Sequence, residues 1–313
     1  MAGYILRRIA ATVPVMLIVA VLVFLMLRLT PGDPAAVIAG DNANAEQIAA
    51  IRTRLGLDQP IVVQFFIWFG QILHGDFGES FFFKKTVAEL IASRLEPTLA
   101  LSLSTILIAV MVAVPLGVIA AWKHGTWIDR CVMGLSVLGF SVPVFVIGYI
   151  LIQLFAIDLR WLPVQGFKSI ANGFGPFLER LVLPTLALSF IYVALIARMT
   201  RASMLDVLGE DYVRTARAKG IAEIAVLFRH ALRNAAVPVI TVIGTGFALL
   251  ISGVVVTESV FNIPGIGRLT VDAVLARDYP VIQAMILLTS LLYVAINLLI
   301  DLAYTLLDPR IRY

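Results

Sequence analysis

Long runs without any charged residue most constrain how this chain of 313 residues folds. We take six runs of this kind as candidate spans, and each is close to the roughly 20 apolar residues that a helix needs to cross a bilayer. They are Ile9–Leu27, Pro97–Trp122, Cys131–Ile157, Leu181–Ala197, Asn234–Thr257 and Tyr279–Ile300. We therefore predict an all-α polytopic membrane protein with six transmembrane helices.

Composition excludes several other classes. Hydrophobic residues make up 60% of the chain and charged residues 14%, which is more apolar surface than a soluble fold of this length buries. The net charge of +4 fits basic cytoplasmic loops better than nucleic-acid binding, so we expect no nucleic-acid partner. Cys131 is the single cysteine and the three histidines are scattered, so we expect no disulfide and no metal site.

The first apolar run follows Arg7 and Arg8, as the apolar part of a cleaved signal peptide would. It is longer than such a segment usually is, and Arg28-Leu-Thr-Pro follows it where small residues would mark a cleavage site. We expect a retained helix.

Lys and Arg in short loops set the orientation, because they resist translocation. With the N-terminus inside, thirteen such residues are cytoplasmic and five lie in short outer loops. The inner set is Arg7, Arg8, Lys123, Arg130, Arg198, Arg201, Arg214, Arg217, Lys219, Arg229, Arg233, Arg310 and Arg312, and the outer set is Arg160, Lys168, Arg180, Arg268 and Arg277. We predict that both termini are cytoplasmic.

A long extracytoplasmic segment, Leu29–Glu96, follows the first helix. Its motifs PGDP (31–34), GLDQP (56–60) and GDFGES (75–80) are typical of turns between short helices. We expect helices over Ala45–Leu55 and over the aromatic-rich Val62–Leu73. The second of these lies either along the membrane interface or in a purely structural collar. We divide the chain into this N-terminal part, residues 1–96, and a five-helix core, residues 97–313.

The cytoplasmic loop 198–233 holds the most distinctive segment, GEDYVRTARAKG, from Gly209 to Gly220. Its acidic residues precede its basic residues, which suits a helix macrodipole, and Glu210 and Arg214 have i,i+4 spacing. Gly220 is placed to end the helix in the left-handed conformation. We predict a short, stiff helix that forms a compact knob.

One face of this helix would carry Tyr212, Thr215, Ala216 and Lys219. Small residues beside a tyrosine suit close contact with another protein. The same helix could instead rest on lipid headgroups through its arginines. Spacing alone leaves both interpretations open.

Two acidic residues stand at the edges of predicted spans, where burial of charge is costly. Glu258 closes the fifth span just before the Pro264-Gly265 turn, and it is a candidate for an outer gate or a docking surface. Asp301 lies near the inner end of the sixth span. We expect Asp301 to form an ion pair with Arg198 or Arg201 at the inner end of the fourth span.

Catalytic motifs are missing from the sequence. There is no GxxxxGK[ST] phosphate loop, and the GIG at 265–267 follows no predicted strand. Ser141 has no histidine partner within a span, so a membrane protease is disfavoured. An ion-driven secondary transporter remains the alternative of a different class, although all six spans lack the midplane acids that it would be expected to show.

The segment DYVRTARAKG, followed by RHALRNA (229–235) and Pro238, resembles the cytoplasmic loop of permease subunits of bacterial ABC importers for oligopeptides, dipeptides and nickel. The resemblance covers nearly the whole chain. It includes LRLTPGDP, GLDQP and GDFGES near the start, and ESVFNIPGIGRL (258–269), RDYP (277–280) and NLLIDLAYTLLDPRIRY (297–313) near the end. The N-terminal pattern is similar to the first of the two permeases in such systems.

This resemblance implies the type I importer fold and a coupling helix that docks on a cytosolic ATPase. The residues that it assigns to coupling are Glu210, Asp211, Tyr212, Arg214, Thr215, Ala216, Lys219 and Gly220. Arg214 and Thr215 stand where the general loop consensus has Glu-Ala, so no role of the consensus glutamate is carried over.

The resemblance also implies partners and a location. We expect a second homologous permease, two ATPase subunits that bind ATP and Mg²⁺, and an extracytoplasmic substrate-binding protein, in a bacterial inner membrane. The expected outer gate or binding-protein contact comprises Glu258, Phe261, Pro264 and Gly265. We expect a transport subunit without catalytic residues or a cofactor of its own, whose cargo is short peptides, or alternatively nickel or another small solute.

Overall fold

A computed structural model describes residues 2–29, 35–36, 44–54, 56–80 and 82–307. Within these ranges the chain is helical, and β pairing is limited to one isolated bridge between Glu79 and Thr86. The PGDP motif at 31–34 and residues 308–313 lie outside the described residues. The chain forms two compact units, which we call the core unit (Glu96–Gly267 and Ala295 onward) and the flanking unit (Ala2–Leu95 and Arg268–Val294).

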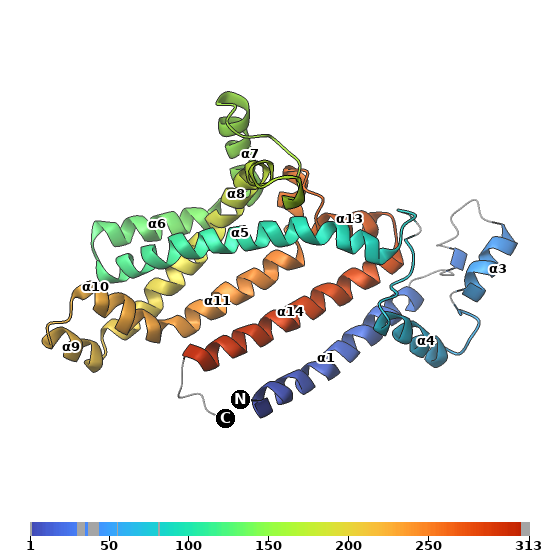
Figure 1. The fold of residues 1–313 in the computed structure, drawn as a ribbon, viewed down its shortest axis with the longest axis horizontal. Helices are drawn as coiled ribbons and strands as arrows, with labels where there is room; N and C mark the ends of the chain where they lie inside the picture. Colours follow the sequence, from blue (N-terminus) through green and yellow to red (C-terminus); the bar gives the residue numbers. More distant parts are fainter. Residues whose placement is uncertain (1, 30–34, 37–43, 55, 81, 308–313) are drawn as a thin grey trace. The chain divides into compact units, whose positions relative to one another are not determined.

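Four helical segments are long and apolar enough to cross a membrane. They are α5 (Val87–Trp122), α8 (Phe174–Leu208), the segment Glu223–Ile251 that runs through α10 (Glu223–Ala225), η3 (Val226–Ala231) and α11 (Leu232–Gly253), and Tyr279–Tyr304 of α14 (Tyr279–Leu307) (Figure 1). The first predicted span lies in α1 (Ala2–Leu29), whose apolar stretch Ala10–Met26 is shorter. The membrane-spanning character of the chain is thus confirmed at four helices, or five with a bent pair.

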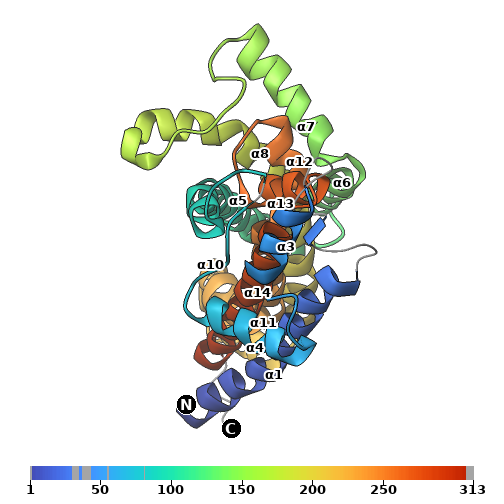
Figure 2. The same ribbon diagram turned by 90° about the vertical axis from the view of Figure 1, so that its right-hand side faces the viewer.

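The third predicted span, Cys131–Ile157, is wrong as a single helix. It consists of α6 (Trp127–Ser141) and α7 (Val144–Leu151), which continues into the π-helical η1 (Ile152–Asp158), and the two parts are bent by 99° (Figure 2). The cause is Pro143, which has no N–H and pushes the preceding residue out of the helical region. Val142 accordingly has the extended values φ −94° and ψ 122°.

The fourth span is longer than the charge-free run suggested. α8 continues past Ala197 to Leu208 and ends at Gly209, so Arg198 and Arg201 lie on a helix and not in a loop. Charged side chains end a hydrophobic run without ending the helix, since arginine is a good helix former.

Small residues bring the helices of the core unit close together. A Cβ atom added to Gly117 of α5 would lie 2.6 Å from Cβ of Thr200 on α8, and one added to Gly139 of α6 would lie 2.7 Å from Cβ of Ala194. Such close approach is typical of helix packing in membranes. α8 packs against α6, α7 and α11 and is therefore the central helix of this unit.

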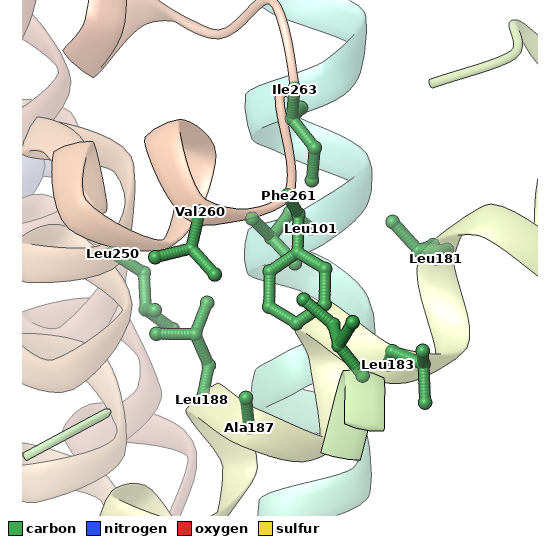
Figure 3. Packing of buried hydrophobic residues seen from close by; sticks show 10 residues of the cluster. Leu101, Leu181, Leu183, Ala187, Leu188, Leu250, Val260, Phe261 and Ile263 are labelled. Carbon is green, nitrogen blue, oxygen red and sulfur yellow. The ribbon is translucent and has the colours of Figure 1, made fainter. Parts of the chain in front are cut away.

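A cluster of buried apolar side chains in the core unit holds the segment that follows α12 (Val255–Val260). Figure 3 shows the Phe261 ring among side chains from α5, α8 and α11. The buried members are Leu101, Ile152, Leu181, Leu183, Ala187, Leu188, Leu250, Val260, Phe261 and Ile263. This packing fixes residues 261–263 against three long helices.

The flanking unit contains the two helices expected in the segment after the first span. α3 (Ala45–Arg54) begins with a reciprocal cap, because Gln47 N donates to Asn44 Oδ1 at 2.8 Å and Asn44 N donates to Gln47 Oε1 at 3.0 Å. α4 (Ile61–Leu73) packs on α1, and α13 (Ile266–Leu275) precedes α14. The predicted helices over 45–55 and 62–73 are confirmed to within one residue.

Candidate functional site

The charged segment after α8 forms the short helix α9 (Asp211–Ala218), as the sequence predicted. Glu210 precedes it in an extended conformation, with φ −72° and ψ 148°. Gly220 follows it with φ +74°, the left-handed region that side chains disfavour. The helix is therefore an element separate from α8 and from α10.

One side of α9 is anchored in the core unit. Val213 and Ala216 are buried, and they pack with Val226 against the partly buried Val207, Leu208 and Ile221. The expectation that Ala216 belongs to an exposed docking face is thus wrong. Sequence reasoning missed Val213, although its i,i+3 spacing to Ala216 was a signal for this internal face.

Polar contacts complete the attachment of α9. Tyr212 Oη accepts a hydrogen bond of 2.7 Å from Nδ2 of Asn234, which lies on α11. The Arg217 guanidinium forms an ion pair with Glu223 of α10 at 2.8 Å. Both contacts are partly or largely exposed, and both tie α9 to the start of the following long helix. Asn234 and Glu223 were not among the predicted site residues.

The rest of α9 is an open, mixed-charge surface. Arg214 pairs with Asp211 at 2.9 Å, an i,i+3 contact, in place of the i,i+4 partner Glu210 that spacing suggested. The exposed predicted residues are Glu210, Asp211, Tyr212, Arg214, Thr215, Lys219 and Gly220. The structure therefore brings seven of the eight predicted coupling residues to one exposed element.

An ion pair joins α6 to α8 near the same end of the core unit. The Arg201 guanidinium donates through Nε and Nη2 to the two oxygens of Asp129, at 2.5 and 2.8 Å. Asp129 is buried and also accepts from Gly125 N at 3.0 Å and contacts His124 Nδ1 at 3.2 Å. The partner of Arg201 is therefore Asp129, and the expected pair of Asp301 with Arg201 is wrong.

The other two members of the expected ion pair lie elsewhere. The guanidinium carbon of Arg198 lies 4.9 Å from the ring centroid of Phe140 on α6. Asp301 lies on α14 and is partly buried. The pairing of Asp301 with Arg198 stays a prediction.

Glu258 of α12 is fully buried in the core unit, with 0% of its surface exposed. Thr98 of α5 donates its Oγ1 hydroxyl to Glu258 Oε1 at 2.8 Å, and Thr98 Oγ1 in turn accepts from Ile266 N at 2.8 Å. Two segments separated by 160 residues are joined in this way. The expectation that Glu258 offers a docking surface to another protein is therefore wrong.

The glycine of the Pro264-Gly265 turn makes room for this carboxylate. A Cβ atom added to Gly265 would lie 1.9 Å from Glu258 Oε1. Phe261 is buried, Pro264 is partly buried, and Phe261 O accepts from Gly166 N at 2.8 Å. The contacts of this segment are internal to the core unit and stabilise its fold. Its role as an outer gate stays a prediction.

A comparable polar contact organises the flanking unit. Asp278 is buried just before α14, and its Oδ2 accepts from the Ser80 hydroxyl and, at 3.3 Å, from Phe82 N. The motif GDFGES, which was interpreted as a turn, and the motif RDYP, which was noticed for its resemblance, are thus in direct contact. Within the described part of the chain, no group of three or more His, Cys, Asp or Glu residues is arranged to hold a metal ion.

Comparison with known protein families explains this arrangement. Residues 113–313 match the family described as "Binding-protein-dependent transport system inner membrane component", and residues 1–102 match its N-terminal counterpart. The chain belongs to this family. It is accordingly a permease subunit of an ABC transporter and an inner-membrane protein.

Curated relatives are similar over the full length of this permease. A probable peptide ABC transporter permease of Sinorhizobium fredii is 58% identical over 313 residues, which are 100% of both chains. A glutathione transport system permease of Salmonella typhi is 48% identical, and a putative peptide transport system permease of Brucella abortus is 47% identical, each over 100% of both chains.

A solved structure with a similar fold is an inward-facing conformation of the MetNI methionine ABC transporter. The TM-score is 0.57, with 16% sequence identity, and the match covers 70% of this chain and 96% of that one. At this identity the likeness concerns the fold alone, which is that of an ABC importer permease.

Proposed function

We propose that this permease forms half of the translocation path of an ATP-driven importer for short peptides. A second, homologous permease forms the other half, two cytosolic ATPase subunits drive the cycle, and an extracytoplasmic binding protein delivers the peptide. The relatives named as peptide permeases at 58% and 47% identity support the cargo class. The proposed topology has six spans and two cytoplasmic termini, with the bent α6–α7 pair as the third span.

The observation that carries this proposal is the construction of α9. A helix whose charges face solvent while Val213 and Ala216 anchor it internally has the form of a knob presented to a partner. The contacts of Tyr212 with Asn234 and of Arg217 with Glu223 join the knob to the segment Glu223–Ile251. A displacement of α9 by an ATPase would therefore reach a membrane-spanning helix directly.

Energy for transport must come from another chain in this proposal. The sequence lacks the GxxxxGK[ST] loop that cradles ATP phosphates, so ATP and Mg²⁺ bind the ATPase subunits. This chain contributes no catalytic residue and no cofactor site.

In this proposal the segment 258–265 contributes to the outer gate because its internal contacts keep its backbone in one conformation. The Glu258 carboxylate, fixed by Thr98, sets the position of the turn at Pro264 and Gly265. The binding protein then contacts exposed parts of residues 29–96 instead of Glu258.

A tripeptide-like cargo is the second candidate. The relative named as a glutathione permease is 48% identical over the full chain, which lies between the 58% and 47% of the two peptide permeases. The six apolar runs contain no charged residue that would distinguish a tripeptide from a dipeptide by charge.

Uptake by the complete set of subunits in proteoliposomes tests the proposal. Labelled di- and tripeptides, with glutathione as a third probe, should accumulate only when ATP and the binding protein are present. Accumulation driven by an ion gradient with this chain alone would contradict the proposal and favour a secondary transporter.

A bulky substitution on the exposed face of α9 tests the coupling part. Thr215→Trp should abolish uptake while the permease still inserts and folds, because Thr215 is exposed and does not serve the internal anchor. Ala202→Trp, at an exposed position on α8, is the control and should retain uptake. Normal uptake by Thr215→Trp would contradict a docking role for α9.

A further inference from the structure

The helix α4 of the flanking unit presents a broad apolar surface that its own chain leaves uncovered. None of its thirteen residues is charged, and only Gln64 is buried. Its exposed apolar side chains include Val62, Val63, Phe66, Ile67 and Leu73, which are between 42% and 70% exposed. At 3.6 residues per turn these positions form one continuous face.

The opposite face of α4 packs on the end of α1. The ring centroid of Phe24 lies 5.2 Å from that of Phe65 and 5.5 Å from that of Trp68. Arg28 Nε donates to Gln64 Oε1 at 3.0 Å. Trp68, Phe69 and Ile72 join Ala20, Val23 and Leu287 in one buried cluster. α4 is thus packed firmly against α1 and α14 on one side and bare on the other.

These contacts give the depth of α4 relative to the span in α1. Arg28 is the first charged residue after the apolar run, and it marks the end of the span. Phe24 precedes it by four residues, which is about 6 Å along a helix axis. An amphipathic helix at the membrane interface lies about 5–10 Å into the boundary between headgroups and acyl chains.

α14 marks the same level independently. Gln283 is buried and donates to the backbone oxygen of Val23 at 2.9 Å. Gln283 follows Asp278 by five residues, just as Val23 precedes Arg28 by five. The charged residues that bound the two spans therefore lie at one level, and α4 lies slightly below it.

We infer that α4 is embedded in one leaflet of the bilayer, with Val62, Phe66 and Leu73 in contact with lipid acyl chains. The neighbouring α1 also exposes apolar side chains, among them Ile18 and Leu22, which are 60% and 62% exposed. Asp58 before α4 and Asp76 after it are exposed, so both ends of the helix return to water. A charge-free helix whose glutamines are the buried Gln64 and the exposed Gln71, with charged residues only beyond its ends, matches a lipid surface better than the polar rim of a protein interface.

This inference goes beyond the proposed function, and only the identity of the leaflet, the outer one, rests on the proposed topology. Its consequence is a second membrane attachment for the segment between α1 and α5. The first attachment is α1 itself. With two attachments, the position of residues 56–80 is fixed relative to the membrane surface as well as to the span.

Spin labels measure this depth directly. In a Cys131→Ser background, Val62→Cys, Phe66→Cys and Leu73→Cys are labelled with a nitroxide in proteoliposomes of phosphatidylethanolamine and phosphatidylglycerol that hold the assembled transporter. Asp58→Cys serves as the aqueous reference, and Leu107→Cys, exposed near the middle of α5, as the deep reference. Power saturation with oxygen and with a water-soluble nickel chelate gives the ratio of the two accessibilities.

All three α4 labels should favour oxygen several-fold over the Asp58 label, with ratios between those of the two references. Preference for the nickel chelate would place α4 in water and overturn the inference. Low accessibility to both reagents would overturn it too, because another protein chain would then cover the face. An impermeant thiol reagent applied from outside to the Asp58→Cys variant tests the leaflet separately, so failure of the topology is distinguished from failure of the embedding.

Discussion

Charged side chains are exposed at one end of the core unit and buried at the other. At α9 the charged side chains face solvent while two small apolar residues anchor the helix. At α12 the charged residue, Glu258, is itself buried. Thr98 donates a hydrogen bond to its carboxylate, and Gly265 leaves the space that the carboxylate occupies. Both segments drew attention in the sequence through glycines and charges. Their difference shows that such motifs mark internal bracing as readily as contact surfaces.

This contrast has a simple energetic basis. A buried carboxylate is costly unless hydrogen bonds satisfy it, so its partners are constrained as strictly as the residue itself. Exposed ion pairs contribute little to stability, and their side chains are free to meet a partner. Substitutions near Glu258 should therefore change stability, and substitutions on the open face of α9 should change transport.

The largest effect is expected at Gly265. In Gly265→Val the new Cβ would occupy the space of the Glu258 carboxylate, so we expect a loss of about 3 kcal/mol in the free energy of unfolding. Thermal unfolding of the purified permease in detergent measures it. Gly220→Ala is the control from the other end, where the space is open and only the positive φ costs about 1 kcal/mol. Equal unfolding temperatures for the two variants would break the contrast.

A smaller loss should follow from Thr98→Val, which keeps the shape and removes the hydroxyl. Glu258 Oε1 loses the hydrogen bond from Thr98 and Ile266 N loses the one to Thr98, at a cost of about 2 kcal/mol. Thr105→Val is the matched control, because the buried Thr105 hydroxyl has no hydrogen-bond partner in the described part of the chain. The control should be neutral or stabilising. Destabilisation of both variants by the same amount would show that shape, and not the hydrogen bonds, matters here.

At α9, Tyr212→Phe should have a moderate effect on stability and a larger one on transport. Loss of the hydroxyl that accepts from Asn234 should cost about 1 kcal/mol, since Tyr212 is 40% exposed. We expect uptake per ATP hydrolysed to fall several-fold as α9 loosens from α11. A double-mutant cycle with Asn234→Ala isolates this hydrogen bond. If the two substitutions lower uptake additively, the hydrogen bond does not couple α9 to α11.

The smallest effect on stability is expected for Arg214→Gln. Its pair with Asp211 is highly exposed on both sides, so unfolding should not change measurably. Uptake should still decrease if the open face docks on an ATPase. A variant with lowered unfolding temperature and normal uptake would reverse the roles assigned to the two faces of α9.

Local features of the fold were predictable from the sequence. α9 was found because its glycines and the order of its charges act within one short segment. α3 and α4 were found for the same reason. The bend before Pro143 was also a local signal, since a proline displaces the residue before it, and the uninterrupted apolar run concealed it.

Long-range contacts were beyond the reach of sequence patterns. Glu258 finds its partner Thr98 at a separation of 160 residues, and Arg201 finds Asp129 at a separation of 72. A single sequence carries no record of such pairings, so Glu258 was a candidate for an outer gate or a docking surface, and Asp301 was expected to pair with Arg198 or Arg201. The inner face of α9 was missed because Val226 and Ile221 reach it only after the chain reverses.

Crosslinking from α9 tests the central claim most directly, namely that this helix joins the permease to a nucleotide-driven motor. In a Cys131→Ser background, Thr215→Cys and the control Ala202→Cys are treated with a short bifunctional thiol reagent in membranes that carry out ATP-dependent peptide uptake. The account predicts that the Thr215→Cys variant captures an ATPase subunit and that the control captures none. Active membranes in which Thr215→Cys never captures an ATPase subunit would contradict it.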